Sequence, residues 1–174
     1  RCGTALSSHE VAQGYKDVED PSWTFSARVL NDSGGPGPGG RAFLVWTTTP
    51  WTVPANTGLA VYPDLTYAEV LSDSGRYIVA ESRVEALFGD AAAVGTKWKG
   101  AELAGLRYER PLDLVPEPSE RGNGWTVVVE DFVGAEEGTG VVHIAPAFGA
   151  DDYVAGQKHG LPMINPIDAA GCFV

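Results

Sequence analysis

The pattern of polar and apolar positions along the chain, with several short β-rich runs between turn residues, predicts a fold made mostly of strands. Residues 23–30, WTFSARVL, alternate between polar and apolar, and RAFLVWTTT at 41–49 is the next run that predicts a strand. Between them, NDSGGPGPGG at 31–40 has the composition of a flexible Gly/Pro loop, so we expect a hairpin with a long tip. The other runs that predict strands are 58–62, 66–72, 76–81, 124–133 and 138–146.

Two segments show the features of short helices. SRVEALFGD at 82–90 has apolar residues at helical spacing, and its Gly89 is a stop signal. FGADDYVAGQKHG at 148–160 has acidic residues in its first turn and a basic residue near its end, as the helix dipole favours. Residues 99–112 fit neither pattern clearly. Many short strands with a few short helices predict a β-rich α+β domain that is barrel-like, closed or nearly closed.

Length and composition are those of a soluble globular protein. The 174 residues suffice for one domain with a core, and the chain is 44% hydrophobic and 20% charged. No run approaches the roughly 18 apolar residues of a membrane span, and no signal-peptide pattern is present. We therefore expect a single domain over 1–174 without a membrane partner. Because the chain begins at Arg1 and ends in GCFV, we also expect a fragment excised from a longer protein.

The formal net charge of −11 argues against one class of function, independent binding of nucleic acid through a basic face. A nucleic-acid substrate would need other parts of a parent protein to hold it.

Cysteine and histidine residues are few and lie far from ligand spacing, so we expect no metal site within this chain. Cys2 and Cys172 lie at opposite ends and are as compatible with reduced thiols as with a bridge. The opening RCG fits the second half of a Cys-x-x-Cys pair. Cys2 would then bind zinc in the parent protein, with ligands outside this chain.

The stretch WTTTPWTVPAN at 46–56 places four threonines and two tryptophans at one bend. Pro50 and Pro54 fix φ and remove backbone donors, so the chain must leave the sheet here along a stiff path. Held hydroxyls beside flat indoles suit a pocket for a small polar ligand. An edge strand running into a turn has a similar composition, and composition alone favours that second interpretation.

The stretch GTGVVHIAPAFGADDY at 138–153 carries His143 in mid-strand, and Asp151 and Asp152 open the following helix. This order can aim an imidazole and a carboxylate into one cleft. The alternatives are that both aspartates only cap the helix, worth about 1 kcal/mol, and that the histidine is a satisfied strand residue. Spacing alone does not choose between them.

Together, the two stretches resemble the paired signature of the editing domain inserted in isoleucyl-tRNA synthetases, a class I aminoacyl-tRNA synthetase family. The resemblance runs from RCGTALSSHEVAQGY at 1–15 to GLPMINPIDAAGCF at 160–173, and so covers essentially the whole chain. Valyl and leucyl relatives share the paired threonines, the GTG strand and the final aspartate. They usually carry Arg at the place of Thr49 and an acid at the place of Trp51, and they typically have no histidine at the place of His143.

This resemblance implies a barrel-like editing domain and an enzyme activity, hydrolysis of the ester that joins a wrongly attached valine to tRNA(Ile). The implied partners are the valine-carrying acceptor end of that tRNA and the remainder of a cytoplasmic synthetase, whose ligase body binds ATP. No cofactor is implied within the domain, and the isolated piece is expected to be a monomer. A non-catalytic aminoacyl-binding module and a purely structural insert remain alternatives.

The resemblance also assigns roles to residues. Asp152 would accept the α-ammonium group of the substrate, with Asp151 as its capping neighbour. His143 would contact the amino acid or position water, although no partner carboxylate marks it as a general base. The expected catalytic set is Asp152, His143 and Thr48, and the expected substrate-binding set is Thr47, Thr49, Trp51, Thr52 and Asn56, of which Asn56 would be a polar contact or a brace. The family usually has Gly-His where this chain has Ala147 and Phe148, which puts any polar role at that place in doubt.

Overall fold

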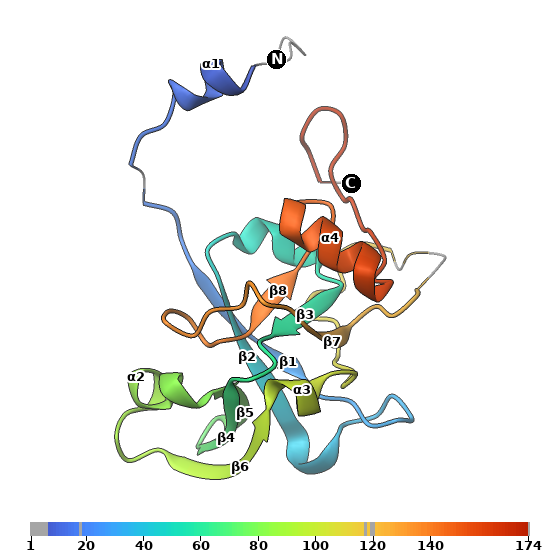
Figure 1. Cartoon of the computed structure of the whole chain (residues 1–174). Coiled ribbons are helices and arrows are strands. Elements are labelled where there is room, and N and C mark those ends of the chain that lie inside the picture. The colour runs from blue at the N-terminus through green and yellow to red at the C-terminus, as the bar shows by residue number, and fades with distance from the viewer. Residues whose placement is uncertain (1–6, 18, 117, 119–120, 174) are drawn as a thin grey trace.

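The structure, a computed structural model, describes residues 7–17, 19–116, 118 and 121–173. Its strands form two sheets (Figure 1), one of five strands in the order β1-β2-β5-β4-β6 and one of three in the order β7-β3-β8. The strands are β1 Trp23–Arg28, β2 Arg41–Thr47, β3 Gly58–Val61, β4 Thr66–Ser72, β5 Gly75–Ala80, β6 Ala93–Lys99, β7 Thr126–Val129 and β8 Val142–Ile144.

The helices are short, and the 3-10 turns and helices other than α1 lie between or beside the strands. The α-helices are α1 Ser8–Ala12, α2 Val84–Phe88, α3 Gly100–Leu103 and α4 Ala150–His159, and the 3-10 turns are η1 Pro38–Gly40, η2 Pro50–Ala55 and η3 Glu81–Arg83. In Figure 1, α1 lies apart from the rest of the ribbon, and α4 lies beside β8. Within the described part of the chain, every helix is too short or too polar to cross a membrane.

The predicted α+β, strand-rich class is confirmed. The two sheets do not close into a barrel in the described residues, but they are connected along one side. Residues 105–109 connect the two sheets along one side: the N–H of Leu30, just past β1, donates to the carbonyl of Arg107 at 2.8 Å, and the N–H of Tyr108 donates to the carbonyl of Trp125 at 3.0 Å. In the described residues no ladder runs round the whole molecule, since the two sheets keep separate strand orders.

One strand was not predicted. β6 is an edge strand that pairs only with β4, and every residue in it except Trp98 is exposed. An exposed edge strand shows no alternation between buried and solvated faces, so the sequence carries no period-2 signal there. The helix that follows it, α3, lies in the segment whose pattern was ambiguous.

The core lies between the sheets and includes Phe43 and Val45 of β2, Leu59 of β3 and Tyr67 of β4, all fully buried. Tyr67 also donates its hydroxyl to the carbonyl of Gly140 at 2.7 Å, which holds the entry to β8 against the larger sheet. The end of β2 and the whole of β8 are therefore held by the core, and the candidate site lies beside them.

Candidate active site

The threonine-rich bend follows β2 directly. The strand ends at Thr47 and η2 begins at Pro50, as expected for a chain forced out of the sheet. Proline at the first position of a helical turn costs no hydrogen bond, because that N–H would have no partner within the turn. The turn ends where the N–H of Asn56 donates to the carbonyl of Val53 at 2.9 Å. The sequence therefore folds this stretch into a fixed bend.

The hydroxyl groups of this bend form a connected network. Thr47 Oγ1 accepts a hydrogen bond from the N–H of Thr49 at 3.1 Å and lies 3.3 Å from Thr49 Oγ1. Thr49 Oγ1 lies 3.2 Å from Thr52 Oγ1, and Thr52 Oγ1 donates to the carbonyl of Thr49 at 2.8 Å. Thr48 is exposed and takes no part in these bonds, so its hydroxyl is not used within this network.

His143 lies at the centre of β8, where it pairs with Leu59 of β3. Its Nε2 is 3.0 Å from Thr52 Oγ1, which joins the imidazole to the threonine network across 91 positions of sequence. The side chain is only 7% exposed, and burial lowers the pKa of His143 to about 4 from its ordinary 6.5. The imidazole is therefore neutral at physiological pH and has no imidazolium proton to donate.

Asp152 lies in the first turn of α4, with one carboxylate oxygen already in use. Asp152 Oδ2 accepts a hydrogen bond from the N–H of Ala145 at 2.9 Å, which leaves Oδ1 for a ligand. Gly149 permits this close placement, because a Cβ there would lie 3.0 Å from Asp152 Cγ. Burial and, in smaller measure, the Asp151 carboxylate raise the pKa of Asp152 above its ordinary 3.8, against the opposing effect of the Ala145 N–H.

The capping role considered for the two aspartates is wrong. The N-cap of α4 is Gly149, which makes no side-chain cap, and Asp151 and Asp152 both lie inside the first turn. Their charges still complement the positive end of the helix dipole.

One pocket of about 450 Å³ brings the two stretches together. It lies where the end of β2 and η2 face β8 and the start of α4. Seven of the eight residues predicted for the site line it, namely Thr47, Thr48, Thr49, Trp51, Thr52, His143 and Asp152.

Asn56, the eighth, does not line this pocket. It is 1% exposed, accepts the Tyr108 hydroxyl at 2.7 Å through Oδ1 and donates to the carbonyl of Gly58 at 2.9 Å through Nδ2. Both ends of its amide are in use within the protein, which favours the second of the two expected roles, a brace rather than a substrate contact. Asn56 fixes the exit of the bend into β3.

Four residues outside the expected catalytic and substrate-binding sets also line the pocket, namely Trp46, Val142, Phe148 and Gly149. Trp46 is one of the two tryptophans whose indoles suggested a pocket at the bend, whereas the only signal for Val142 was its place directly before His143. Phe148 is 40% exposed and, with the 48% exposed Trp51, places aromatic surface at the pocket. The doubt about a polar group at Phe148 is therefore resolved in favour of an apolar one.

A glycine-rich loop, residues 134–141, supports the Trp46 side of the pocket. Gly138 has φ +60°, and a Cβ there would lie 2.7 Å from Trp46 Cε3, so the loop packs directly against the indole. Arg83 holds this loop by donating from Nε to the carbonyl of Gly138 at 3.0 Å and from Nη1 to the carbonyl of Glu136 at 2.9 Å.

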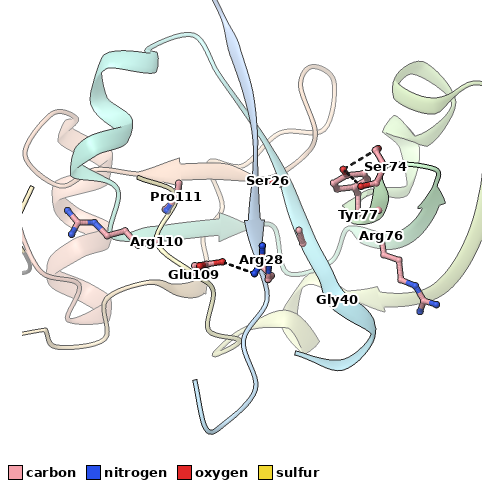
Figure 2. A pocket seen from close by; sticks show the side chains of 11 residues that line it. Ser26, Arg28, Gly40, Ser74, Arg76, Tyr77, Glu109, Arg110 and Pro111 are labelled. Carbon is pink, nitrogen blue, oxygen red and sulfur yellow. Dashed lines mark hydrogen bonds and ion pairs between the residues drawn. The ribbon is translucent and has the colours of Figure 1, made fainter. Parts of the chain in front are cut away.

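A second pocket, of about 410 Å³, is lined by different residues and has the more polar surroundings (Figure 2). Arg28 is paired there with Glu109 at 3.4 Å. Figure 2 shows Arg76 and Arg110 pointing in opposite directions, away from that pair. The guanidinium groups of this second pocket do not converge on one point, so we do not assign a ligand to it.

Within the part of the chain that the structure describes, no group of three or more His, Cys, Asp or Glu side chains could hold a metal ion. Cys172 is an exposed free thiol. Cys2, the residue expected to bind zinc in a parent protein, lies outside the described residues.

Comparison with known proteins gives the family. No family model matches the chain. It is 46% identical to the isoleucine–tRNA ligase of Picrophilus torridus over 173 residues, which are 99% of this chain and 16% of that protein. It is also 46% identical to the isoleucine–tRNA ligase of Thermobifida fusca over 174 residues, again 99% of this chain and 16% of that protein. The chain belongs to the isoleucine–tRNA ligase family.

Solved structures give the fold of this synthetase segment. A crystal structure described as GlLeuRS-CP1 matches with a TM-score of 0.63 and 17% identity, covering 79% of this chain and 60% of that one. The editing domain of the Plasmodium knowlesi (P. knowlesi) cytosolic leucyl-tRNA synthetase matches with a TM-score of 0.55 and 16% identity, covering 80% and 62%. The expected editing-domain fold is thereby confirmed.

Proposed function

We propose that this segment is a hydrolase that edits isoleucyl-tRNA synthesis, cleaving the ester between a wrongly attached valine and tRNA(Ile). One extra methylene in an apolar pocket is worth only about 1–3 kcal/mol, and isoleucine against valine is itself a standard illustration of that limit. A synthetic site that recognises isoleucine therefore also accepts valine. A second, smaller site that destroys the valyl product removes the error.

The observation that carries this proposal is the gathering of seven predicted residues around one pocket of about 450 Å³. The pocket combines a carboxylate, an exposed hydroxyl and aromatic walls, which suit the ammonium, ester and apolar side chain of an aminoacyl group. Editing-domain fold and synthetase family support the same activity independently of the pocket.

Asp152 pairs with the α-ammonium group of the substrate in this proposal. Its Oδ2 is held by the N–H of Ala145, so the carboxylate has a fixed direction before the substrate arrives. A fixed carboxylate orients the ester without a further loss of side-chain entropy, and orientation supplies much of the rate enhancement for hydrolysis. The hydroxyl of Thr48, an exposed residue that lines the pocket, binds the ester or the terminal ribose.

Water is the nucleophile, and no covalent intermediate or metal is required. His143 does not act as the general base, because its Nε2 is bonded to Thr52 and its Nδ1 is buried. Activation then comes from positioned water and from polarisation of the ester within the pocket.

The tRNA partner must be held mainly by the remainder of the synthetase. The net charge of −11 repels the phosphate backbone, so this segment contributes the pocket and little of the grip.

The test is the rate of deacylation of valyl-tRNA(Ile) and of isoleucyl-tRNA(Ile) by the purified chain, each against buffer. Faster loss of valine alone is the expected result. Equal loss of both amino acids would show that the pocket does not select by size. Binding of the valyl ester without turnover, both here and in the full-length parent, would favour the non-catalytic module.

A further inference from the structure

A tight turn, residues 121–124, packs against the C-terminal end of α4. The N–H of Asn123 donates to the carbonyl of Gly160 at 2.9 Å, and Asn123 Nδ2 donates to the carbonyl of His159 at 2.8 Å. Gly122 permits this close approach, because its φ is +49° and a Cβ there would lie 2.6 Å from the carbonyl oxygen of Gly160. Asn123 therefore satisfies one of the carbonyls that a helix leaves without a partner at its C-terminus, and the carbonyl just beyond it.

A carboxylate that follows β7 holds the same end of the helix. Glu130 Oε1 lies 2.6 Å from His159 Nε2 and 3.0 Å from Lys158 Nζ. Two segments that do not line the Asp152 pocket, the 121–124 turn and Glu130, thus fix the last turn of α4.

The rest of α4 has few attachments to the domain. The helix has 10 residues, of which Ala155 and Gly156 alone are buried. Helices shorter than about 12–15 residues are marginal on their own in water, and a glycine in the middle weakens a helix further. Gly156 is explained by packing, since a Cβ there would lie 2.9 Å from Pro146 Cγ. The position of α4 therefore depends on the contacts at its two ends.

Asp152 makes the contact at the pocket end of α4, about 10 Å along the helix axis from His159. Its Oδ2 accepts the N–H of Ala145 at 2.9 Å. We infer that Asn123 is a positioning residue for the editing site, which holds the last turn of α4 and so keeps the Asp152 carboxylate against Ala145. Asn123 lines a different pocket from Asp152, so it acts through the helix and not by contact with the substrate. The effect on hydrolysis rests on the proposed function, whereas the coupling between the two ends of α4 does not.

The first test follows amide hydrogen exchange by NMR and does not depend on hydrolysis. Asn123→Asp keeps the shape of the side chain but replaces its donor by a carboxylate, which repels the carbonyl of His159. The amide of Leu161, which donates to Gly156, reports the last turn, and the amide of Ala145 reports the Asp152 contact. We expect both amides to exchange about fivefold faster than in the wild type, as for the loss of one typical hydrogen bond.

Asn31→Asp is the matched control. Asn31 also donates from Nδ2 to a backbone carbonyl, that of Pro36 at 3.2 Å, in an exposed loop remote from α4 (Figure 1), so this variant should leave both amides as in the wild type. Faster exchange at Leu161 alone would overturn the inference, because the helix end would then fray without moving Asp152. Unchanged exchange at both amides would overturn it as well. If circular dichroism shows that Asn123→Asp does not fold, Asn123→Ala removes the donor without adding a charge, and the same results are expected.

The second test is a double-mutant cycle with Asp152→Asn, measured as kcat/KM for valyl-tRNA(Ile). In the wild-type background, Asn123→Asp should lower kcat/KM by about fivefold. In the Asp152→Asn background the ammonium contact is already lost, so the same change should lower it by less than about twofold. Equal falls in both backgrounds would refute the positioning role, because independent sites contribute additively. If the wild type does not hydrolyse the ester, the proposed function fails, while hydrogen exchange still decides the coupling along α4.

Discussion

Replacement of Asp152 by asparagine and by alanine separates its charge from its hydrogen bond. The carboxylate accepts the N–H of the fully buried Ala145 at 2.9 Å. Asparagine keeps an oxygen for this bond and therefore directs its NH₂ group toward the position proposed for the substrate ammonium. Donor then faces donor, so Asp152→Asn should lose the ammonium contact while retaining the local structure.

The size of the loss follows from the contact removed. A hydrogen bond to a charged group contributes about 1.5–3 kcal/mol net, and 1.36 kcal/mol is a factor of ten in rate. We expect kcat/KM for valyl-tRNA(Ile) to fall by about 10- to 150-fold in Asp152→Asn. In Asp152→Ala the activity should be lost as well, and the unpaired N–H of Ala145 should lower the free energy of unfolding by about 1–3 kcal/mol.

Stability and pH give two independent controls. Because burial raises the pKa of Asp152, the folded state holds the ionised carboxylate at a cost at neutral pH, and neutral asparagine should leave the unfolding free energy unchanged or higher. The ionised carboxylate is the form that binds the ammonium, so wild-type hydrolysis should fall as pH drops through this raised pKa. Urea unfolding, circular dichroism and deacylation assays at several pH values make these measurements. Hydrolysis by Asp152→Asn at the wild-type rate would refute the ammonium contact.

Three other changes test the supports of the site. Because the pKa of His143 falls from 6.5 to about 4 on folding, protonation of the unfolded chain should cost the wild type about 2 kcal/mol of stability between pH 7 and pH 5; urea titrations should show this loss missing from His143→Gln. Tyr108→Phe leaves the buried Asn56 Oδ1 unpaired and should lower the unfolding free energy by about 1–3 kcal/mol, whereas an unchanged denaturation midpoint would contradict the bracing role. Arg83→Ala removes two hydrogen bonds to the 134–141 loop, so amide hydrogen exchange in that loop should accelerate while the core exchanges as before.

Local patterns in the sequence were enough to predict most of the elements. Short β-rich runs between turn residues located seven of the eight strands, and Gly89 ends α2 as predicted. The signal is local in β1, where buried and exposed residues alternate, and also in β3, a short apolar run whose four residues are all buried. Glycine tolerates the backbone conformations that end a helix, and Gly160 follows α4 in the same way. β6 lacks such a signal because it lies exposed at the sheet edge.

The site could be predicted only in part, for a different reason. Thr52 and His143 were both candidates, but their contact depends on the register in which β8 pairs with β3 and on the path of η2 between β2 and β3. Neither the register of β8 nor the path of η2 can be predicted from the spacing of the residues. The sequence left Asn56 as either a polar contact or a brace, because its partner, the Tyr108 hydroxyl, lies 52 positions away in a segment whose pattern was ambiguous.

Contacts within this chain fix the interior of the pocket, whereas the negative charge of the surface would repel the proposed tRNA substrate. The threonine network, the Thr52–His143 contact and the Asp152–Ala145 bond all join described residues of the segment itself. If the proposed function holds, the net charge of −11 repels the tRNA phosphates and weakens capture of the substrate by the segment alone. Affinity for the tRNA and selectivity for the amino acid therefore have separate origins. The body of a synthetase can supply the affinity without altering the selectivity. The ratio of valyl to isoleucyl hydrolysis should therefore be the same in the isolated segment and in the parent, even where their KM values differ.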